Sequence, residues 1–100
     1  MQRTTSANKV VVSDITELTA ANASSIKEEI KAGITDDHTQ IDIDLSSTQF
    51  VDSSGLGVLI GLHKAMSLKG GSIRILNPTE SVQQVLELTR LHRLLEIVNE

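Results

Sequence analysis

The chain has 100 residues, of which 39% are hydrophobic and 22% are charged. This composition is typical of one globular domain that is too small to divide into two. The absence of cysteine excludes disulfide bonds, thiolate nucleophiles and cysteine-ligated metal centres. The net charge is −4 and Phe50 is the only aromatic residue, so the chain offers neither the basic face nor the stacking platform of a nucleic-acid binder.

The sequence predicts a single domain over residues 1–100 and no membrane insertion. The most apolar run, Val58 to Leu62, is far shorter than the roughly 20 residues of a membrane-spanning helix. The start of the chain has no apolar stretch of the signal-peptide type. We therefore expect a cytoplasmic protein, in which residues 1–8 form a flexible N-terminal tail.

In the first half of the chain, the pattern predicts two strands with a helix between them. Lys9–Ser13 is a β-branched run typical of a short strand. Apolar residues then recur at helical spacing, with Thr19 as the expected N-cap and Gly33 just past the helix end. Residues 41–45 alternate strictly, which sends three apolar side chains to one face of a strand and two aspartates to the other.

The centre of the chain predicts a buried helix. Phe50 and Val51 are expected to point into the core, and residues 52–55 then supply several side chains that favour a helix start. Residues 56–68 are apolar on nearly all sides, as in a helix surrounded by other elements. Ser72–Leu76 predicts the next strand.

The second half completes an alternating order of strands and helices. Asn77 and Pro78 predict the start of a third helix, and residues 95–98 a final strand. The expected inner stripe of that helix is Val82, Val85, Leu86 and Thr89. Short strands separated by helix-length segments need crossover connections, so we predict an α/β fold: a mixed, mostly parallel sheet of about four strands with helices packed on it.

One central segment carries a specific motif. Asp44-Leu45-Ser46 is followed by Phe50-Val51-Asp52-Ser53-Ser54-Gly55-Leu56-Gly57-Val58-Leu59. This segment resembles the STAS domain family, in particular its anti-sigma-factor antagonist type, and weaker similarity covers most of the chain. The resemblance implies a STAS-like fold and a role in protein binding.

The resemblance also implies a site. In the antagonist branch of the family, the serine directly after the motif aspartate is phosphorylated by an anti-sigma factor that is also a serine kinase. That residue is Ser53, with Ser54 as the lesser candidate, and Asp52, Gly55 and Leu56 would join both serines in binding the partner. The unmodified form would bind the anti-sigma factor and free a sigma factor, and a PP2C-type serine phosphatase would restore it. No catalytic residue, cofactor or metal is expected.

The residues themselves support a modification site at this place. The free N–H groups at the start of a helix favour an anion by about 0.3–1 kcal/mol. A phosphoserine adds about −1.5 to −2 charges, here beside Asp52, so repulsion offsets part of this gain. We expect a change of surface charge rather than refolding. The alternatives are that Ser53 only caps the helix and that Asp52 is a plain N-cap.

The chain departs from the family pattern in three places. Residues 16–19 read Thr-Glu-Leu-Thr rather than Gly-Glu-Leu-Asp. Arg90 takes the place of a common helix-ending glycine, and since a left-handed conformation costs such a residue about 1–2 kcal/mol, we expect the helix to run on. Many relatives continue past the position of Glu100 into a last helix, so we expect apolar surface that a partner or a second copy would cover.

Other classes of function have weaker support. A serine hydrolase needs a histidine beside its nucleophile, but His63 lies ten residues from Ser53 on the same predicted helix, roughly 15 Å away. Three glycines at 55, 57 and 61 faintly resemble a dinucleotide-binding loop with the wrong last spacing. We interpret His38 as part of a solvated turn rather than as a metal ligand.

The main competing hypothesis assigns the chain to the same family but gives it a different role. A STAS domain whose motif serine is never phosphorylated would serve as a subunit or scaffold of a larger signalling or lipid-transport complex. Such a scaffold is expected to expose a larger apolar interface than a reversible antagonist.

Overall fold

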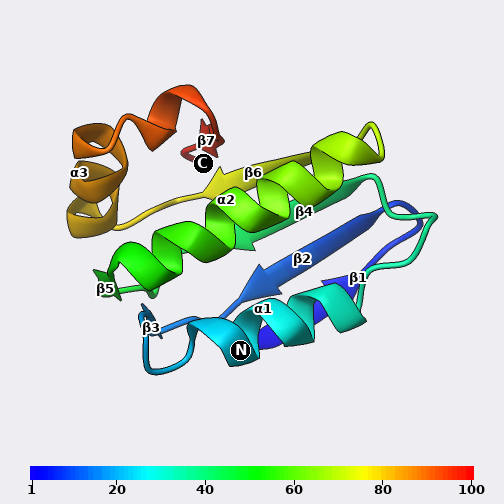
Figure 1. The fold of residues 1–100 in the computed structure, drawn as a ribbon, viewed down its shortest axis with the longest axis horizontal. Helices are drawn as coiled ribbons and strands as arrows, with labels where there is room; N and C mark the ends of the chain where they lie inside the picture. Colours follow the sequence, from blue (N-terminus) through cyan, green and yellow to red (C-terminus); the bar gives the residue numbers. More distant parts are fainter.

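A computed structural model describes residues 1–100 and shows an α/β fold in which helices cover one face of a sheet (Figure 1). The five-stranded sheet has the order β1-β2-β4-β6-β7, and all pairs are parallel except β1 with β2. Its strands are β1 (Gln2–Thr5), β2 (Lys9–Ser13), β4 (Gln40–Asp44), β6 (Ser72–Leu76) and β7 (Glu96–Val98). The predicted class is confirmed, with one strand more than expected.

Three helices and a second, smaller sheet complete the fold. The helices are α1 (Ala23–Ala32), α2 (Ser53–Leu68) and α3 (Glu80–Leu88), followed by the 3-10 turn η1 (Leu91–Arg93). Two-residue strands β3 (Glu17–Leu18) and β5 (Phe50–Val51) pair in parallel. None of the helices combines the length and the apolar character that a membrane crossing requires.

The N-terminal residues differ from the predicted flexible tail. Gln2–Thr5 form β1, which runs antiparallel to β2 from Gln2 opposite Ser13 to Thr5 opposite Val10. The turn between the two strands is closed by hydrogen bonds between Ser6 and Lys9. All four residues of β1 are exposed, and the strand therefore lacks the apolar alternation by which a half-buried strand is predicted.

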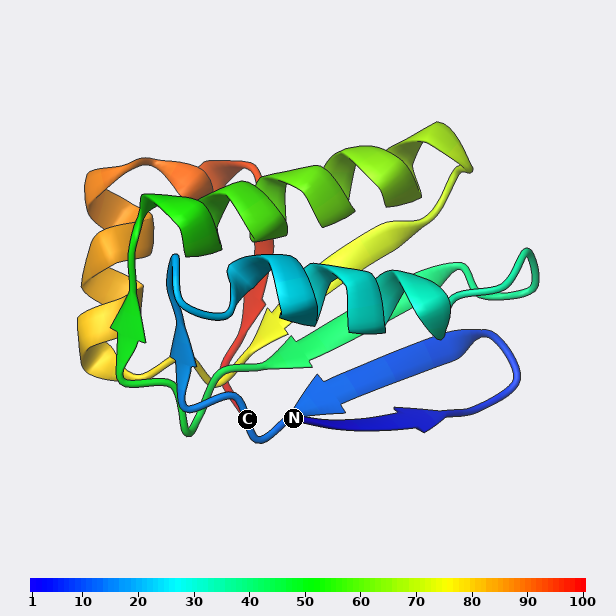
Figure 2. The same ribbon diagram turned by 60° about the horizontal axis from the view of Figure 1, so that its bottom comes forward.

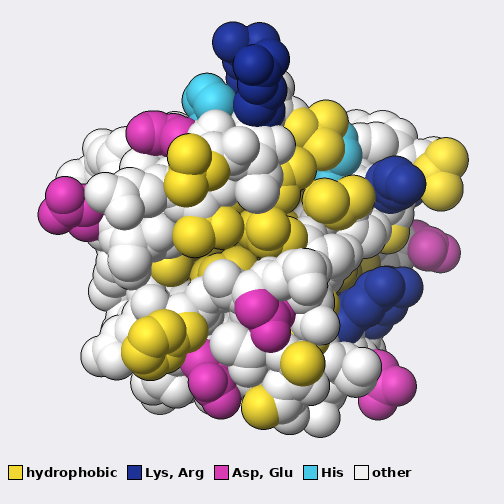
Figure 3. Space-filling view, turned by 60° about the vertical axis from the view of Figure 1, so that its left-hand side comes forward, with side chains coloured by type: hydrophobic (Ala, Val, Ile, Leu, Met, Phe, Trp, Pro, Cys, Tyr) yellow, Lys and Arg dark blue, Asp and Glu magenta, His cyan; other side chains and the backbone are white.

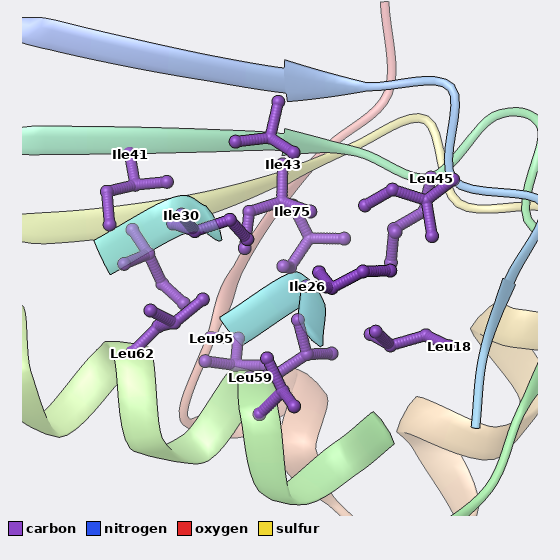
Figure 4. Packing of buried hydrophobic residues seen from close by; sticks show 14 of the residues in the cluster. Leu18, Ile26, Ile30, Ile41, Ile43, Leu45, Leu59, Leu62, Ile75 and Leu95 are labelled. Atoms are coloured by element: carbon purple, nitrogen blue, oxygen red, sulfur yellow. The ribbon is translucent and has the colours of Figure 1, made fainter. Parts of the chain in front are cut away.

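Helices α1 and α2 lie side by side on the same face of the sheet (Figure 2). Side chains from this face of the sheet meet those of both helices in a single core (Figure 4). The isoleucines and valines of β2, β4 and β6 point toward the helices at every second position, as a pleated strand requires. The main contributors are Val10, Val12, Ile26, Ile30, Ile41, Ile43, Leu59, Leu62, Met66, Ile73 and Ile75.

The opposite face of the sheet carries an ion-pair cluster. The alternation predicted for β4 is confirmed for its apolar residues, but Asp42 on the other face is buried too. Its carboxylate accepts hydrogen bonds from Arg74 Nε (3.0 Å), Arg74 Nη2 (2.7 Å) and Gln40 Nε2 (2.7 Å), and Lys9 Nζ lies 3.5 Å away. Burial alone would raise the pKa of Asp42, but these hydrogen bonds and the charges of Arg74 and Lys9 lower it overall.

Two predicted helix starts were wrong. Helix α1 begins at Ala23, because the Thr19 carbonyl accepts hydrogen bonds from the N–H groups of Asn22 and Ala23 and closes a turn instead. Helix α3 begins two residues after Pro78, with Thr79 in the N-cap position. Asn77 is left-handed (φ 50°), and its side chain accepts a hydrogen bond from the Glu100 N–H (2.7 Å).

The end of α3 also differs from the prediction. Arg90 adopts the left-handed conformation (φ 62°) and the helix stops at Leu88, so the expectation that it would run on was wrong. The hydroxyl of Thr89 donates to the Val85 carbonyl (2.8 Å) in the last turn. Of the predicted inner stripe, Val82 and Leu86 are buried, Val85 is half-buried and Thr89 is exposed.

Candidate functional site

Helix α2 begins at the motif, and Asp52 is its N-cap. One carboxylate oxygen accepts a hydrogen bond from the Gly55 N–H (3.0 Å), and the other accepts one from the Ala20 N–H (2.9 Å). Asp52 therefore joins the start of α2 to the loop between β3 and α1. These bonds, from Ala20 first and Gly55 second, lower the pKa of Asp52, so the carboxylate is ionised at neutral pH.

Ser53 and Ser54 are the first two residues of α2, and both are exposed. Because Asp52 makes the capping bond, the alternative that Ser53 serves only as the cap is wrong. The helix starts at Ser53 rather than at Leu56, so the serine hydroxyls lie where backbone N–H groups have no partner within the helix. An oxygen at this place is open to another protein and has an environment that tolerates an anion.

The glycines of the motif have different surroundings. Gly55 is buried, and a Cβ atom added to it would lie 2.0 Å from the Leu18 carbonyl oxygen. Because Gly55 has no side chain, the backbone of β3 can pack directly against the first turn of α2, where the site lies. Gly57 is exposed, and a Cβ atom there would have no neighbour within 4 Å. Leu56 is half-buried against the core.

A groove lies next to the start of α2, between β5 and α3. Its volume is about 380 Å³, and it is lined by Thr19, Gln49, Phe50, Val51, Asp52, Ser81, Val82 and Val85. Figure 3, which looks at the side of the molecule that bears α3 and β5, shows apolar side chains gathered in the middle of this face. The sequence did not predict this groove, because its walls are about 30 residues apart in the chain.

Phe50 is the clearest difference from the predicted site. It was expected to point into the core, but the residue is 64% exposed, whereas the next residue, Val51, is half-buried. In a strand, consecutive side chains point to opposite faces, so only one of the two can face the core. The one feature of the sequence that could have drawn attention to Phe50 is that it is the only aromatic residue of the chain.

The residues of the other candidate sites do not come together. Ser53 and His63 lie on the same helix, α2, ten residues apart, which is roughly 15 Å along the axis. The three glycines are inside that helix instead of a phosphate-cradling loop. His38 is buried rather than solvated, and its Nδ1 accepts a hydrogen bond from the Thr35 N–H (3.0 Å).

Comparison with known proteins identifies the family. The STAS domain model matches residues 1–100, so the chain belongs to the STAS domain family. A curated relative from Thermotoga maritima, provisionally named an anti-sigma factor antagonist, is 37% identical over 60 residues. This match covers 60% of the chain and 53% of the relative, so it spans about half of the relative's length.

Solved structures share the fold over nearly the whole chain. A Thermotoga maritima crystal structure with the same provisional name has a TM-score of 0.86 at 28% identity and covers 99% of this chain and 85% of the other. The anti-sigma factor antagonist SpoIIAA in its unphosphorylated form has a TM-score of 0.86 at 24% identity, with 99% and 86% covered. SpoIIAA from Bacillus in its phosphorylated form has a TM-score of 0.76 at 22% identity, with 99% and 89% covered.

Proposed function

We propose that this protein is an anti-sigma factor antagonist that works by binding, without catalysis of its own. Its unphosphorylated form binds an anti-sigma factor in the cytoplasm and thereby releases a sigma factor. Phosphorylation of Ser53 by the anti-sigma factor, acting as a serine kinase, ends this binding, and a PP2C-type phosphatase restores it. The observation that carries the proposal is the exposed Ser53 on the first residue of α2, beside an ionised cap.

The expected effect of the phosphate is electrostatic. A phosphoserine at position 53 brings about −1.5 to −2 charges next to the Asp52 carboxylate, which the Ala20 and Gly55 N–H groups keep ionised. A docked partner would have to desolvate both anions. Each 1.4 kcal/mol of lost interaction weakens binding tenfold, so one unfavourable contact is enough for a switch.

Asp52 is not available to act as the base in phosphoryl transfer to Ser53. Both of its carboxylate oxygens accept backbone hydrogen bonds, and its lowered pKa makes it a weak base. The residue that takes the proton from the Ser53 hydroxyl must therefore belong to the kinase, as is usual in protein kinases.

The test is the affinity of Ser53 variants for purified anti-sigma factors of the source organism, measured by calorimetry. We expect Ser53→Ala to bind like the unmodified protein and to resist phosphorylation, and Ser53→Glu to bind at least tenfold more weakly. Ser67→Ala, at an exposed serine near the far end of α2 and outside the proposed site, is the matched control and should keep both affinity and phosphorylation.

Two results would contradict the proposal. Equal affinity of the Ala and Glu variants at position 53 would favour the scaffold role, in which the serine is not a switch. An increase of 80 Da in the intact mass after incubation of the purified protein with ATP and Mg²⁺ alone, the increment that a phosphate adds, would contradict the absence of catalysis.

A further inference from the structure

Phe50 is exposed in a way that the fold does not require. It is the only aromatic residue of the chain and is 64% exposed, although burying a phenylalanine side chain stabilises a protein. It lines the groove between β5 and α3. Aromatic residues, phenylalanine included, are enriched in the cores of protein–protein interfaces relative to the rest of the protein surface.

The groove is held in shape by hydrogen bonds between its two walls. The Thr79 hydroxyl, at the start of α3, donates to the Thr48 carbonyl (2.7 Å), and the Ser81 hydroxyl donates to the Gln49 carbonyl (3.3 Å). The Val82 side chain is buried at its base. A groove that is already formed does not have to be ordered on binding, which reduces the cost of association.

The charges around the groove disfavour an anionic occupant. Its only ionisable lining residue is Asp52. The surrounding elements β3, β5 and α3 contain the carboxylates Glu17, Glu80 and Glu87 and no lysine or arginine. An anion such as a nucleotide phosphate would therefore meet only negative charge, whereas an apolar side chain would contact Phe50 and the valines.

The groove is continuous with the proposed modification site, because Asp52 both lines the groove and caps the helix that Ser53 begins. We propose that this groove receives one aliphatic or aromatic side chain of the anti-sigma factor, with Phe50 as the contact at its edge. This inference rests on the proposed function, since it assigns the same partner to the groove. A phosphate on Ser53 would keep water and negative charge at the groove and so disfavour an apolar occupant.

The test is the affinity of Phe50→Ala for the purified anti-sigma factor, by calorimetry, with the unphosphorylated protein. We expect binding at least tenfold weaker, with an unchanged midpoint of thermal unfolding because the side chain is exposed. Leu68→Ala is the matched control: Leu68 is 90% exposed at the far end of α2, and its truncation should change the affinity less than twofold. Methyl NMR signals of Val51, Val82 and Val85 should shift when the partner is added.

The outcomes separate this inference from the proposed function. Wild-type affinity of Phe50→Ala, or unshifted valine methyl signals, would overturn the groove assignment even if Ser53→Glu abolishes binding. Weak binding by Phe50→Ala together with full binding by Ser53→Glu would support the groove and overturn the switch. A dimer of the purified chain that Phe50→Ala dissociates in sedimentation runs would make a second copy the occupant and overturn the inference.

Discussion

At the scale of single residues, Asp52 determines the geometry of the site. A carboxylate is the side chain best suited to accept two backbone hydrogen bonds at once, and here one donor, Ala20, lies in the loop between β3 and α1 and the other, Gly55, in the first turn of α2. The negative charge also complements the positive end of α2. Ser53 is thus held by a capped helix while its own side chain stays free.

Replacement of Asp52 by Asn should weaken the link between the start of α2 and the loop at Ala20, because the amide retains only one acceptor oxygen for the two N–H donors. We expect faster hydrogen exchange at whichever of the Ala20 and Gly55 amides loses its acceptor, and a lower midpoint of urea unfolding. Asp36→Asn, in an exposed turn, should leave both quantities unchanged. Undiminished protection at both amides would show that the cap does not join the loop at Ala20 to α2.

The sequence motif singles out Ser53 as a candidate site, while nothing in the sequence indicates the groove beside it. All residues from Asp52 to Leu56 are consecutive, so a local pattern is enough to locate the helix start. The groove depends on contacts such as that of Ser81 with Gln49, 32 residues apart. The local sequence pattern does not indicate whether Phe50 or Val51 will be covered by a helix that is distant in the chain.

At the scale of elements, the two motif glycines of α2 have opposite consequences for stability. Glycine in a helix costs about 0.5–1 kcal/mol relative to alanine. At Gly55 the missing side chain lets the backbone of β3 approach α2, which compensates for this cost. Nothing in the chain occupies the space beside Gly57, so there the cost has no compensation.

Alanine substitutions at the two positions should therefore change the free energy of unfolding in opposite directions. Gly57→Ala should raise the free energy of unfolding by about 0.5–1 kcal/mol, since the added methyl meets no atom and the helix gains propensity. Gly55→Ala should lower it by about 1–3 kcal/mol, because the methyl clashes with the Leu18 carbonyl. Urea unfolding of the two variants beside wild type measures both, and changes of the same sign would contradict this account.

The bounds of the central strands were predicted better than the helix ends. The bounds of β2 and β6 agree with the predicted residues 9–13 and 72–76, because runs of β-branched residues specify strands directly. Helix ends depend on competition between caps and turns. Thr19 closes a turn, Pro78 precedes the start of α3 instead of occupying its first turn, and Arg90 accepts a left-handed conformation that local propensity disfavours.

At the scale of the whole molecule, one face of the sheet is covered and the other depends on charge pairing. Asp42 lies between Val11 on β2 and Arg74 on β6 in the register of the strands. Its carboxylate is buried under the side chains that bind it. Loss of its charge would remove the ion pair with Arg74 and weaken the hydrogen bonds between the two side chains.

Stability should accordingly fall in acid. The folded-state pKa values of Asp42 and Asp52 lie below their ordinary values, close to 3.9 in an unfolded chain. Below about pH 4 the unfolded state binds protons that the folded state does not, so stability present above that pH is lost as the pH falls through the folded values. Urea unfolding from pH 7 to pH 3 measures this loss, and a stability that rises on acidification would contradict it.

The Asp42→Asn variant isolates the contribution of the cluster. Its free energy of unfolding at pH 7 should be lower by about 1.5–3 kcal/mol, the range for a hydrogen bond to a charged group, and should depend less on pH below 4. Asp36→Asn again serves as the control, since Asp36 is exposed. An Asp42→Asn variant as stable as wild type would show that the pairing only offsets the cost of burial.

We propose that a phosphate on Ser53 changes binding and leaves the fold intact. The most direct measurement compares the phosphorylated and unmodified proteins by backbone amide NMR and by affinity for the anti-sigma factor. We predict shifts confined to the start of α2, the loop at Ala20 and the groove, together with affinity at least tenfold weaker. Shift changes throughout the sheet, or an unchanged affinity, would contradict the account.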